Sequence, residues 1–167
     1  IRKLKNIYSE KILEGASTIT QQVAKNFVLT SEVSLKRKIK EAILAFRIER
    51  AYSKERIMEL YLNQIYLGEG TYGIAAASLE YFDKSVSDLN YEEAALLAAL
   101  PKAPSKYNPY KSIERAKIRR DLVLKNLYDN SYINKDEYEN LKNKKIKTKK
   151  RKIKLLEEAN FYSEEVR

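Results

Sequence analysis

Glycine and proline are scarce in this chain, and their scarcity is what most constrains the fold. The 167 residues include four Gly and three Pro, against 44% hydrophobic residues. A turn-rich β fold needs more of both, because tight turns depend on the backbone freedom of Gly and the fixed φ of Pro. The composition therefore predicts an all-α, mainly helical protein. Its length suffices for one domain with a proper core, or for a core with an appended lobe.

The chain contains no Cys and no His. The chain can therefore form no disulfide, thiol nucleophile, His base or His/Cys metal site. Any acid–base chemistry within it has to use Asp, Glu, Lys or Tyr. The formal net charge of +10 predicts an anionic partner, either nucleic acid, a membrane surface or a phosphorylated substrate. No run approaches the roughly 18 apolar residues of a membrane-spanning helix. Because the chain starts at Ile1 without Met, we expect it to be a piece of a longer protein.

The stretch from Gly15 to Asn26 predicts a helix with two unlike faces. Three apolar residues recur at helical spacing and form the expected core stripe: Ile19, Val23 and Phe27. Five polar residues form a second face without any carboxylate: Ser17, Thr18, Gln21, Gln22 and Lys25. Neutral donors with one cation beside a helix N-terminus suit a sugar or a phosphate. The alternative is a solvated face with Ser17 as N-cap, and this stretch alone favours that alternative.

The helix from Leu35 to about Tyr52, capped by Ser34, is the most strongly predicted one. Its expected buried side consists of Leu35, Ile39, Ala42 or Ile43, Phe46, and Arg50 or Ala51. Arg37, Lys38 and Glu41 share the opposite side, because helical spacing of three and four residues brings side chains together. One interpretation is a surface ion-pair cluster worth a few tenths of a kcal/mol. The other is a carboxylate set among cations beside an anionic ligand; spacing alone favours the surface cluster.

Further helices are predicted by the same criteria, over 2–13, 54–66, 74–83, 91–100, 112–129 and 135–142. Gly68, Gly70 and Gly73 match the spacing of a dinucleotide-binding motif, but a helix precedes them where that motif needs a strand. We therefore reject this motif and attribute the glycines to close helix packing.

Two segments outside these helices are predicted from their composition. Three prolines predict an extended segment over 101–109. Residues 142–154 hold nine basic and no acidic residues. This run predicts a linker or exposed arm, with contact to nucleic acid or anionic lipid as the second interpretation.

Four blocks stand in order along the chain, and together they resemble the glycosyltransferase domain of class A penicillin-binding proteins and monofunctional peptidoglycan glycosyltransferases (family 51). Residues 15–22, with Lys25 and Asn26, look like the family's GxSTITQQ block, and residues 37–41 look like its RKxxE block. Residues 54–82 resemble the fourth block, and residues 95–109 resemble the fifth. The resemblance covers about residues 1–130. It is specific because the blocks occur in the right order, although each one alone is a weak signal.

The resemblance implies a lysozyme-like, mainly α fold with a large helical lobe and a small membrane-facing jaw. It implies a glycosyltransferase domain over residues 1–141 that lacks its N-terminal catalytic block, followed by a basic linker over 142–167, which leads to a transpeptidase domain. The implied reaction is polymerisation of lipid II. The 4-hydroxyl of lipid II attacks the anomeric carbon of a glycan on undecaprenyl diphosphate, with inversion, and the lipid diphosphate leaves.

The resemblance also implies roles for particular residues. Glu41 matches the family's second glutamate and is the expected catalytic residue. The expected substrate-binding residues are Ser17, Thr18, Gln21, Gln22, Lys25, Arg37, Lys38 and Asn63. The block with the general-base glutamate, EDxxFxxHxG, would lie upstream of Ile1, so this chain holds half of the catalytic apparatus. Many members carry Arg where this chain has Val33. A divalent cation, Mg or Mn, is a candidate at the diphosphate, but no clear protein metal site is encoded.

The expected partners are lipid II, the undecaprenyl-diphosphate-linked glycan, a membrane surface and a covalently attached transpeptidase domain, with no nucleic acid. The expected location is the extracytoplasmic face of a bacterial cell membrane, with an upstream helix as anchor. Two other functions fit the composition. A basic helical nucleic-acid-binding module agrees with the charge and the 13 Tyr, although no recognition motif is present. A membrane-peripheral interaction module without chemistry is the third possibility.

Overall fold

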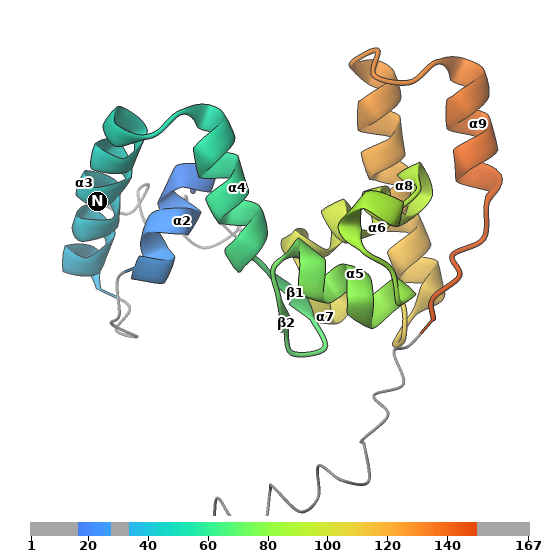
Figure 1. Ribbon diagram of the computed structural model, residues 1–167, viewed down its shortest axis with the longest axis horizontal. Helices are drawn as coiled ribbons and strands as arrows, with labels where there is room; N and C mark the ends of the chain where they lie inside the picture. The colour runs from blue at the N-terminus through green and yellow to red at the C-terminus, as the bar shows by residue number, and fades with distance from the viewer. Residues whose placement is uncertain (1–16, 28–33, 150–167) are drawn as a thin grey trace, which may run out of the picture. The chain divides into compact units, whose positions relative to one another are not determined.

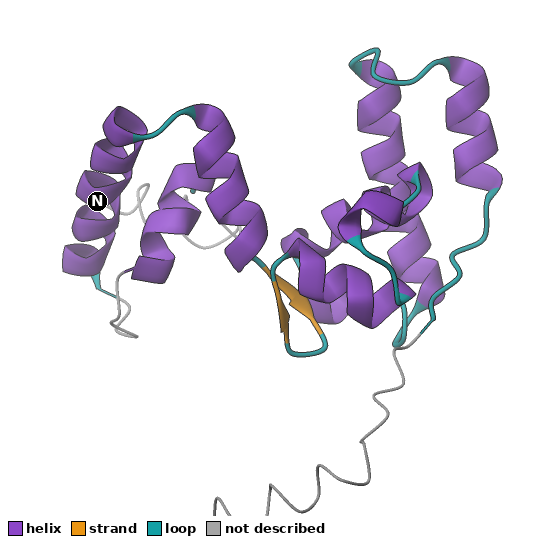
Figure 2. Ribbon diagram, viewed as in Figure 1, coloured by secondary structure: helices purple, strands orange, loops and turns teal. Residues whose placement is uncertain are grey.

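The computed structural model describes residues 17–27 and 34–149 and shows a mainly helical protein, as predicted (Figures 1 and 2). The chain divides into two compact units between Gln64 and Ile65, and each unit is described separately below. The predicted helix over 2–13 lies outside the described residues, as do Gly15 and Val33.

Unit 1 packs its helices around a small apolar core. Its described helices are α2 (Ile19–Phe27), α3 (Leu35–Ala51) and α4 (Lys54–Gln64). The core consists of Val23, Ala24, Ala45, Ile48 and Ile57, with Leu44, Leu60 and Tyr61 packed against it. Ser34 caps α3 as predicted, because its side chain accepts a hydrogen bond from the Arg37 N–H.

The buried face of α3 is opposite to the predicted one. Four apolar side chains that were expected in the core are each more than half exposed: Leu35, Ile39, Ile43 and Phe46. The buried residues of α3 are Glu41, Ala45 and Ile48. The prediction failed because α3 is apolar on both sides, and periodicity alone does not say which apolar side α2 and α4 will cover.

The predicted core stripe of α2 is right only at its centre. Val23 is fully buried, whereas Ile19 is 37% exposed and Phe27 is 53% exposed. The small side chains of Thr20 and Ala24 are buried instead, since close packing against α3 and α4 favours small residues on the shared face.

Unit 2 begins with a short antiparallel hairpin and continues as a group of helices (Figure 1). Its described elements are β1 (Tyr66–Gly68), β2 (Thr71–Tyr72), α5 (Ile74–Phe82), η1 (Val86–Asp88), α6 (Tyr91–Ala99), η2 (Leu100–Lys102), α7 (Pro104–Tyr107), α8 (Ile113–Asp129) and α9 (Lys135–Asn143). Helix α8 packs against both α6 and α9. On α8, Ala116, Arg120 and Leu124 are buried, whereas Ile113 and Leu122 are exposed.

The three glycines lie in the hairpin and at the start of α5. Gly68, Gly70 and Gly73 all have positive φ, between 71° and 95°, which residues with a Cβ rarely adopt. A Cβ on Gly68 would also lie 2.7 Å from the Tyr81 hydroxyl. The positive φ values show that the backbone requires glycine at all three positions, and close helix packing, as predicted, applies at Gly68, where Tyr81 of α5 approaches.

The proline-rich segment is helical rather than extended. Pro101 and Pro104 stand in the first turns of η2 and α7. Proline is compatible with the first turn of a helix, because the missing N–H would have no partner there in any case. The prediction of an extended segment over 101–109 treated these prolines only as helix breakers.

The basic run after α9 is not an exposed arm in the part that the structure describes. The predicted boundary between residues 141 and 142 falls inside α9, and the chain as far as Lys149 is bound to unit 2. Arg120 donates hydrogen bonds to the backbone oxygens of Lys142 (3.0 Å) and Lys144 (2.8 Å). The side chain of Ile146 packs against the core of unit 2. Residues 150–154 of the run lie outside the described residues.

Two tyrosines tie separate elements of unit 2 together. The Tyr81 hydroxyl donates to the backbone oxygen of Leu67 (3.0 Å), and the Tyr110 hydroxyl donates to the backbone oxygen of Glu80 (2.8 Å). Burial, reinforced by nearby carboxylates, raises the pKa of Tyr110 to about 12 and raises the pKa of Tyr81 further. Both phenols therefore stay neutral in the folded protein at pH values where they ionise in the unfolded chain.

We predict a loss of stability at alkaline pH that depends on these phenols. Because the folded pKa of Tyr110 is raised, its stabilising effect is complete below pH 10 and is lost as pH rises from 10 towards 12. Urea unfolding followed by circular dichroism should show this fall in the wild type and a smaller fall in Tyr110→Phe. The exposed Tyr132 provides the control, and an equal effect of Tyr132→Phe would contradict the assignment.

Candidate functional site

The candidate site is built around a buried carboxylate on α3. Only 2% of the Glu41 side chain is exposed, although it lies on the helix side that looked solvent-exposed from the sequence. Burying a lone carboxylate is strongly unfavourable, so Glu41 requires charged or hydrogen-bonding partners. This burial rules out the interpretation of Arg37, Lys38 and Glu41 as an ordinary surface ion-pair cluster.

Two cations from the first turn of α3 supply those partners. Lys38 Nζ lies 3.1 Å from Glu41 Oε2, and Arg37 Nη1 lies 3.2 Å from Glu41 Oε1. The Lys38 contact is a hydrogen bond, whereas neither Glu41 Oε1 nor the buried Arg37 Nε has an aligned hydrogen-bond partner. Glu41 Oε1 is therefore held by charge alone, through the ion pair with Arg37 Nη1.

Lys38 also connects α3 to the start of α2. Its Nζ donates to Ser17 Oγ at 2.9 Å, across 21 residues of sequence. The amide of Gln22 reaches back to the Ser17 backbone oxygen at 3.5 Å. The structure thus brings together Ser17 and Gln22 of the first polar block with Lys38 and Glu41 of the second.

The first turn of α2 is fixed by a reciprocal cap. Thr18 Oγ1 accepts from the Gln21 N–H, and Gln21 Oε1 accepts from the Thr18 N–H, both at 3.2 Å. This is the capping-box arrangement, in which two otherwise unpaired donors are satisfied together. Thr18, and not Ser17, is therefore the cap, which leaves the Ser17 hydroxyl for Lys38. The side chains of Thr18 and Gln21 are engaged by their own helix.

Lys25 and Asn63 are not drawn into this network by any interaction that the structure defines among the described residues. Both are exposed, Lys25 in the last turn of α2 and Asn63 in the last turn of α4. On α4, Glu59 pairs with Arg56 at 2.6 Å.

One interaction near the site was not predicted. Asn26 Nδ2 donates to Gln64 Oε1 at 3.2 Å and so joins the C-terminal ends of α2 and α4. Both residues lie within or next to blocks that the sequence singled out, but a contact across 38 residues leaves no periodic signal in the sequence.

The charges of this cluster suit an anionic ligand better than a metal ion. Arg37 and Lys38 surround a single carboxylate, so the cluster carries a net positive charge. In the described part of the chain, no group of three or more Asp or Glu side chains could together hold a metal ion. A cation placed at Glu41 would meet two ammonium or guanidinium groups at close range.

We predict that Glu41→Gln destabilises unit 1 by about 2 kcal/mol, because it leaves the partly buried Arg37 without a counter-charge. Thermal unfolding of this variant and of Glu49→Gln should show a larger loss of stability for Glu41→Gln. Glu49 is an exposed carboxylate on the same helix, so its loss should change stability by less than about 0.5 kcal/mol. Equal effects of the two substitutions would contradict the structural role given to Glu41.

Comparison with known proteins gives a consistent result. The sequence model of the family described as transglycosylase matches residues 2–128. Penicillin-binding protein 1A of Aquifex aeolicus is 57% identical over 145 residues, which cover 87% of this chain and 20% of that protein. Penicillin-binding protein 1A of Rickettsia felis is 49% identical over 164 residues, which cover 98% of this chain and 21% of that protein.

A solved structure agrees with these matches. The crystal structure of penicillin-binding protein 1A from Haemophilus influenzae aligns with a TM-score of 0.55 and 33% sequence identity. The alignment covers 88% of this chain and 20% of that one. The chain thus spans about a fifth of the length of the relatives that it matches.

Proposed function

The chain belongs to the transglycosylase family, and on this premise we propose that it is the part of a peptidoglycan glycosyltransferase that binds the lipid-linked diphosphate end of the substrate. The observation that carries the proposal is the buried Glu41, held by Arg37 and Lys38 and linked through Lys38 to Ser17. A surface cluster needs no such burial, whereas a site for a charged ligand needs charges in fixed positions before the ligand arrives.

The proposed reaction extends a glycan strand. The 4-hydroxyl oxygen of lipid II forms a bond to the anomeric carbon of the donor, and the bond from that carbon to the undecaprenyl diphosphate breaks with inversion. The hydroxyl proton passes to a base, which we assign to a glutamate outside this chain. Negative charge grows on the leaving diphosphate, and Arg37, Lys38 and Lys25 are the cations that we propose to offset it.

Glu41 would act at the phosphate–sugar end of this site. Its Oε1 atom retains an unused acceptor position, so it can orient a hydroxyl or a hydrated phosphate group. Ser17, Thr18, Gln21, Gln22 and Asn63 remain the proposed contacts to sugar or diphosphate oxygens. The described residues do not fit a divalent cation at this point, because both oxygens of Glu41 face cations.

The proposal predicts that Glu41→Gln in the full-length protein lowers the rate of lipid II polymerisation by about 100-fold or more. The rate should be measured by separation of labelled glycan products at a temperature where circular dichroism shows the variant folded. Glu49→Gln is the matched control and should retain the wild-type rate. If Glu41→Gln polymerises lipid II normally, the enzymatic role of this cluster is wrong. The isolated 167-residue chain should form no polymer.

We also propose that α3 contacts the membrane surface on which a lipid-linked substrate resides. Four large apolar side chains lie exposed along this helix: Leu35, Ile39, Ile43 and Phe46. Four exposed cations flank them: Lys36, Lys40, Arg47 and Arg50. An apolar stripe bordered by basic residues is the composition of helices that lie in the interface of an anionic bilayer. None of the described helices is long and apolar enough to cross a membrane.

This second proposal predicts that Ile43→Asp weakens binding of the chain to vesicles that contain anionic lipid, by about tenfold, in a flotation assay. Ile118→Asp on α8 is the matched control, because Ile118 is also an exposed isoleucine (64%) on a helix of unit 2. Equal losses in the two variants would show that α3 has no special role in membrane binding.

The attached transpeptidase domain and the extracytoplasmic location remain proposals drawn from the relatives, of which this chain covers about a fifth. The nucleic-acid alternative receives no support from the comparisons. Filter binding distinguishes it, because tight, salt-sensitive binding of DNA or RNA without response to a lipid II analogue would favour a nucleic-acid module.

A further inference from the structure

The basic strap, residues 144–149, is held in place along unit 2. Arg120, fully buried in α8, donates to the backbone oxygen of Lys144 at 2.8 Å, and the Lys149 N–H donates to the Tyr81 oxygen at 2.8 Å. Between these two points Ile146 packs against the core. A segment that its composition predicts to be flexible is therefore ordered by the fold.

The strap exposes its cations at alternate positions. Lys145, Lys147 and Lys149 are exposed, whereas Ile146 and Thr148 between them are partly buried. Lys144 is exposed as well. Arg120 and Ile146 thus hold the backbone of a segment that carries four exposed lysines.

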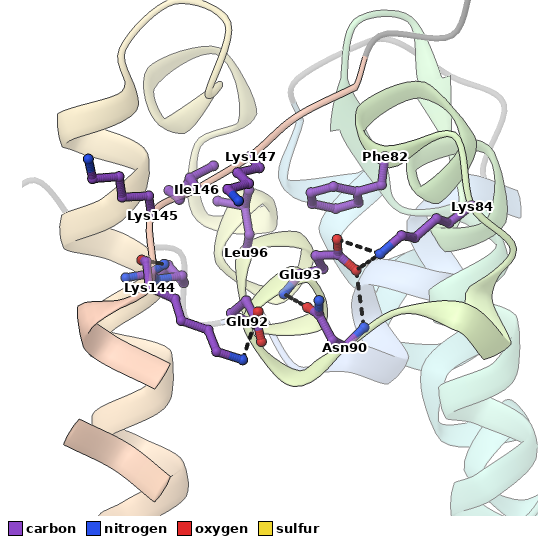
Figure 3. A pocket seen from close by; sticks show the side chains of 11 residues that line it. Phe82, Lys84, Asn90, Glu92, Glu93, Leu96, Lys144, Lys145, Ile146 and Lys147 are labelled. Atoms are coloured by element: carbon purple, nitrogen blue, oxygen red, sulfur yellow. Dashed lines mark hydrogen bonds and ion pairs between the residues drawn. The ribbon is translucent and has the colours of Figure 1, made fainter. Parts of the chain in front are cut away.

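Two of these cations are not neutralised by any ion pair found among the described residues. Lys144 pairs with Glu92 (3.1 Å) and Lys149 pairs with Asp83 (2.7 Å), but Lys145 and Lys147 have no carboxylate within reach. Both line a cavity of about 600 Å³, together with Phe82, Leu96 and Lys84 (Figure 3). Lys84 is already paired with Glu93 at 2.8 Å. The uncompensated positive charge therefore lies on the strap.

We propose that the basic strap is a docking surface for a linear polyanion with repeating phosphate groups. Lysine is suited to phosphate because its ammonium is a compact charge that needs no bidentate geometry. Because the backbone of the strap is held before binding, a polymer that binds it costs less conformational entropy than it would on a flexible tail. This inference does not depend on the transfer reaction proposed for unit 1.

A polyanion fits the strap better than a bilayer does. No large apolar side chain is exposed between residues 144 and 149, so the strap offers nothing to insert among acyl chains. Helix α3, with its exposed Leu35, Ile39, Ile43 and Phe46, shows the contrasting case. The strap can attract a bilayer only by charge, whereas a linear chain of phosphates can follow it from one ammonium group to the next.

The test uses the 167-residue chain and fluorescently labelled long-chain inorganic polyphosphate, with affinity measured by anisotropy between 50 and 300 mM salt. We expect the double variant Lys145→Gln/Lys147→Gln to bind about tenfold more weakly and to lower the salt-dependence slope by about 2. The control variant Lys125→Gln/Lys135→Gln removes the same charge from α8 and α9 and should stay within about threefold of the wild type. Equal losses in the two variants would overturn the proposal.

A second variant tests the ordering. Arg120→Lys keeps the net charge but cannot make both backbone hydrogen bonds, so affinity for polyphosphate should fall about threefold or more while the lysines remain. Ile146→Ser is used instead if circular dichroism shows Arg120→Lys unfolded. Unchanged affinity in the folded variant would contradict the ordered strap. Polyglutamate or anionic vesicles that bind as tightly as polyphosphate, with the same loss in Lys145→Gln/Lys147→Gln, would contradict the choice of partner.

Discussion

The burial of Glu41 is the constraint on which unit 1 depends. A carboxylate that is 1% exposed has to be surrounded by donors, and α3 supplies two of them from its own first turn. Lys38 then reaches Ser17, so the same ion cluster joins two helices that are separated in the sequence. This requirement also determines which side of α3 faces inward. Satisfying Glu41 and packing Ala45 and Ile48 leave a larger apolar stripe exposed, which would be costly in a protein surrounded only by water.

Unit 2 uses a buried cation in a comparable way. Arg120 is fully buried, pairs with Asp121 at 2.7 Å and also donates to the backbone oxygens of Lys142, in the last turn of α9, and of Lys144, just after this helix. In each unit a buried charged side chain therefore holds together segments that are separate in the sequence. Around Glu41 lies the proposed diphosphate site, and beside Arg120 lies the basic strap. In both units the partners of the buried charge come from the protein itself, so they are in place before any ligand binds.

Local features of the fold could be predicted from the sequence, whereas the orientation of helices could not. Ser34 caps α3 as expected, because capping depends on neighbouring residues only, and Ser112 and Asn134 cap α8 and α9 in the same way. The prediction of the buried side of α3 was wrong, because that side depends on which face α2 and α4 cover. Ser17, Lys38 and Glu41 were predicted as site residues from the ordered sequence blocks. In the structure Lys38 contacts both of the other side chains. The Asn26–Gln64 contact was missed because a single long-range hydrogen bond has no local signature.

The central claim is that the cations around Glu41 form a site for a diphosphate and do not serve packing alone. The most direct measurement is calorimetric binding of a soluble lipid-diphosphate analogue to the full-length protein and to two variants, Arg37→Gln and Arg47→Gln. Both substitutions remove one arginine from α3, but Arg37 pairs with Glu41, whereas Arg47 is exposed. The account predicts a loss of affinity of about tenfold or more for Arg37→Gln and little change for Arg47→Gln. Equal affinities for the two folded variants would contradict it.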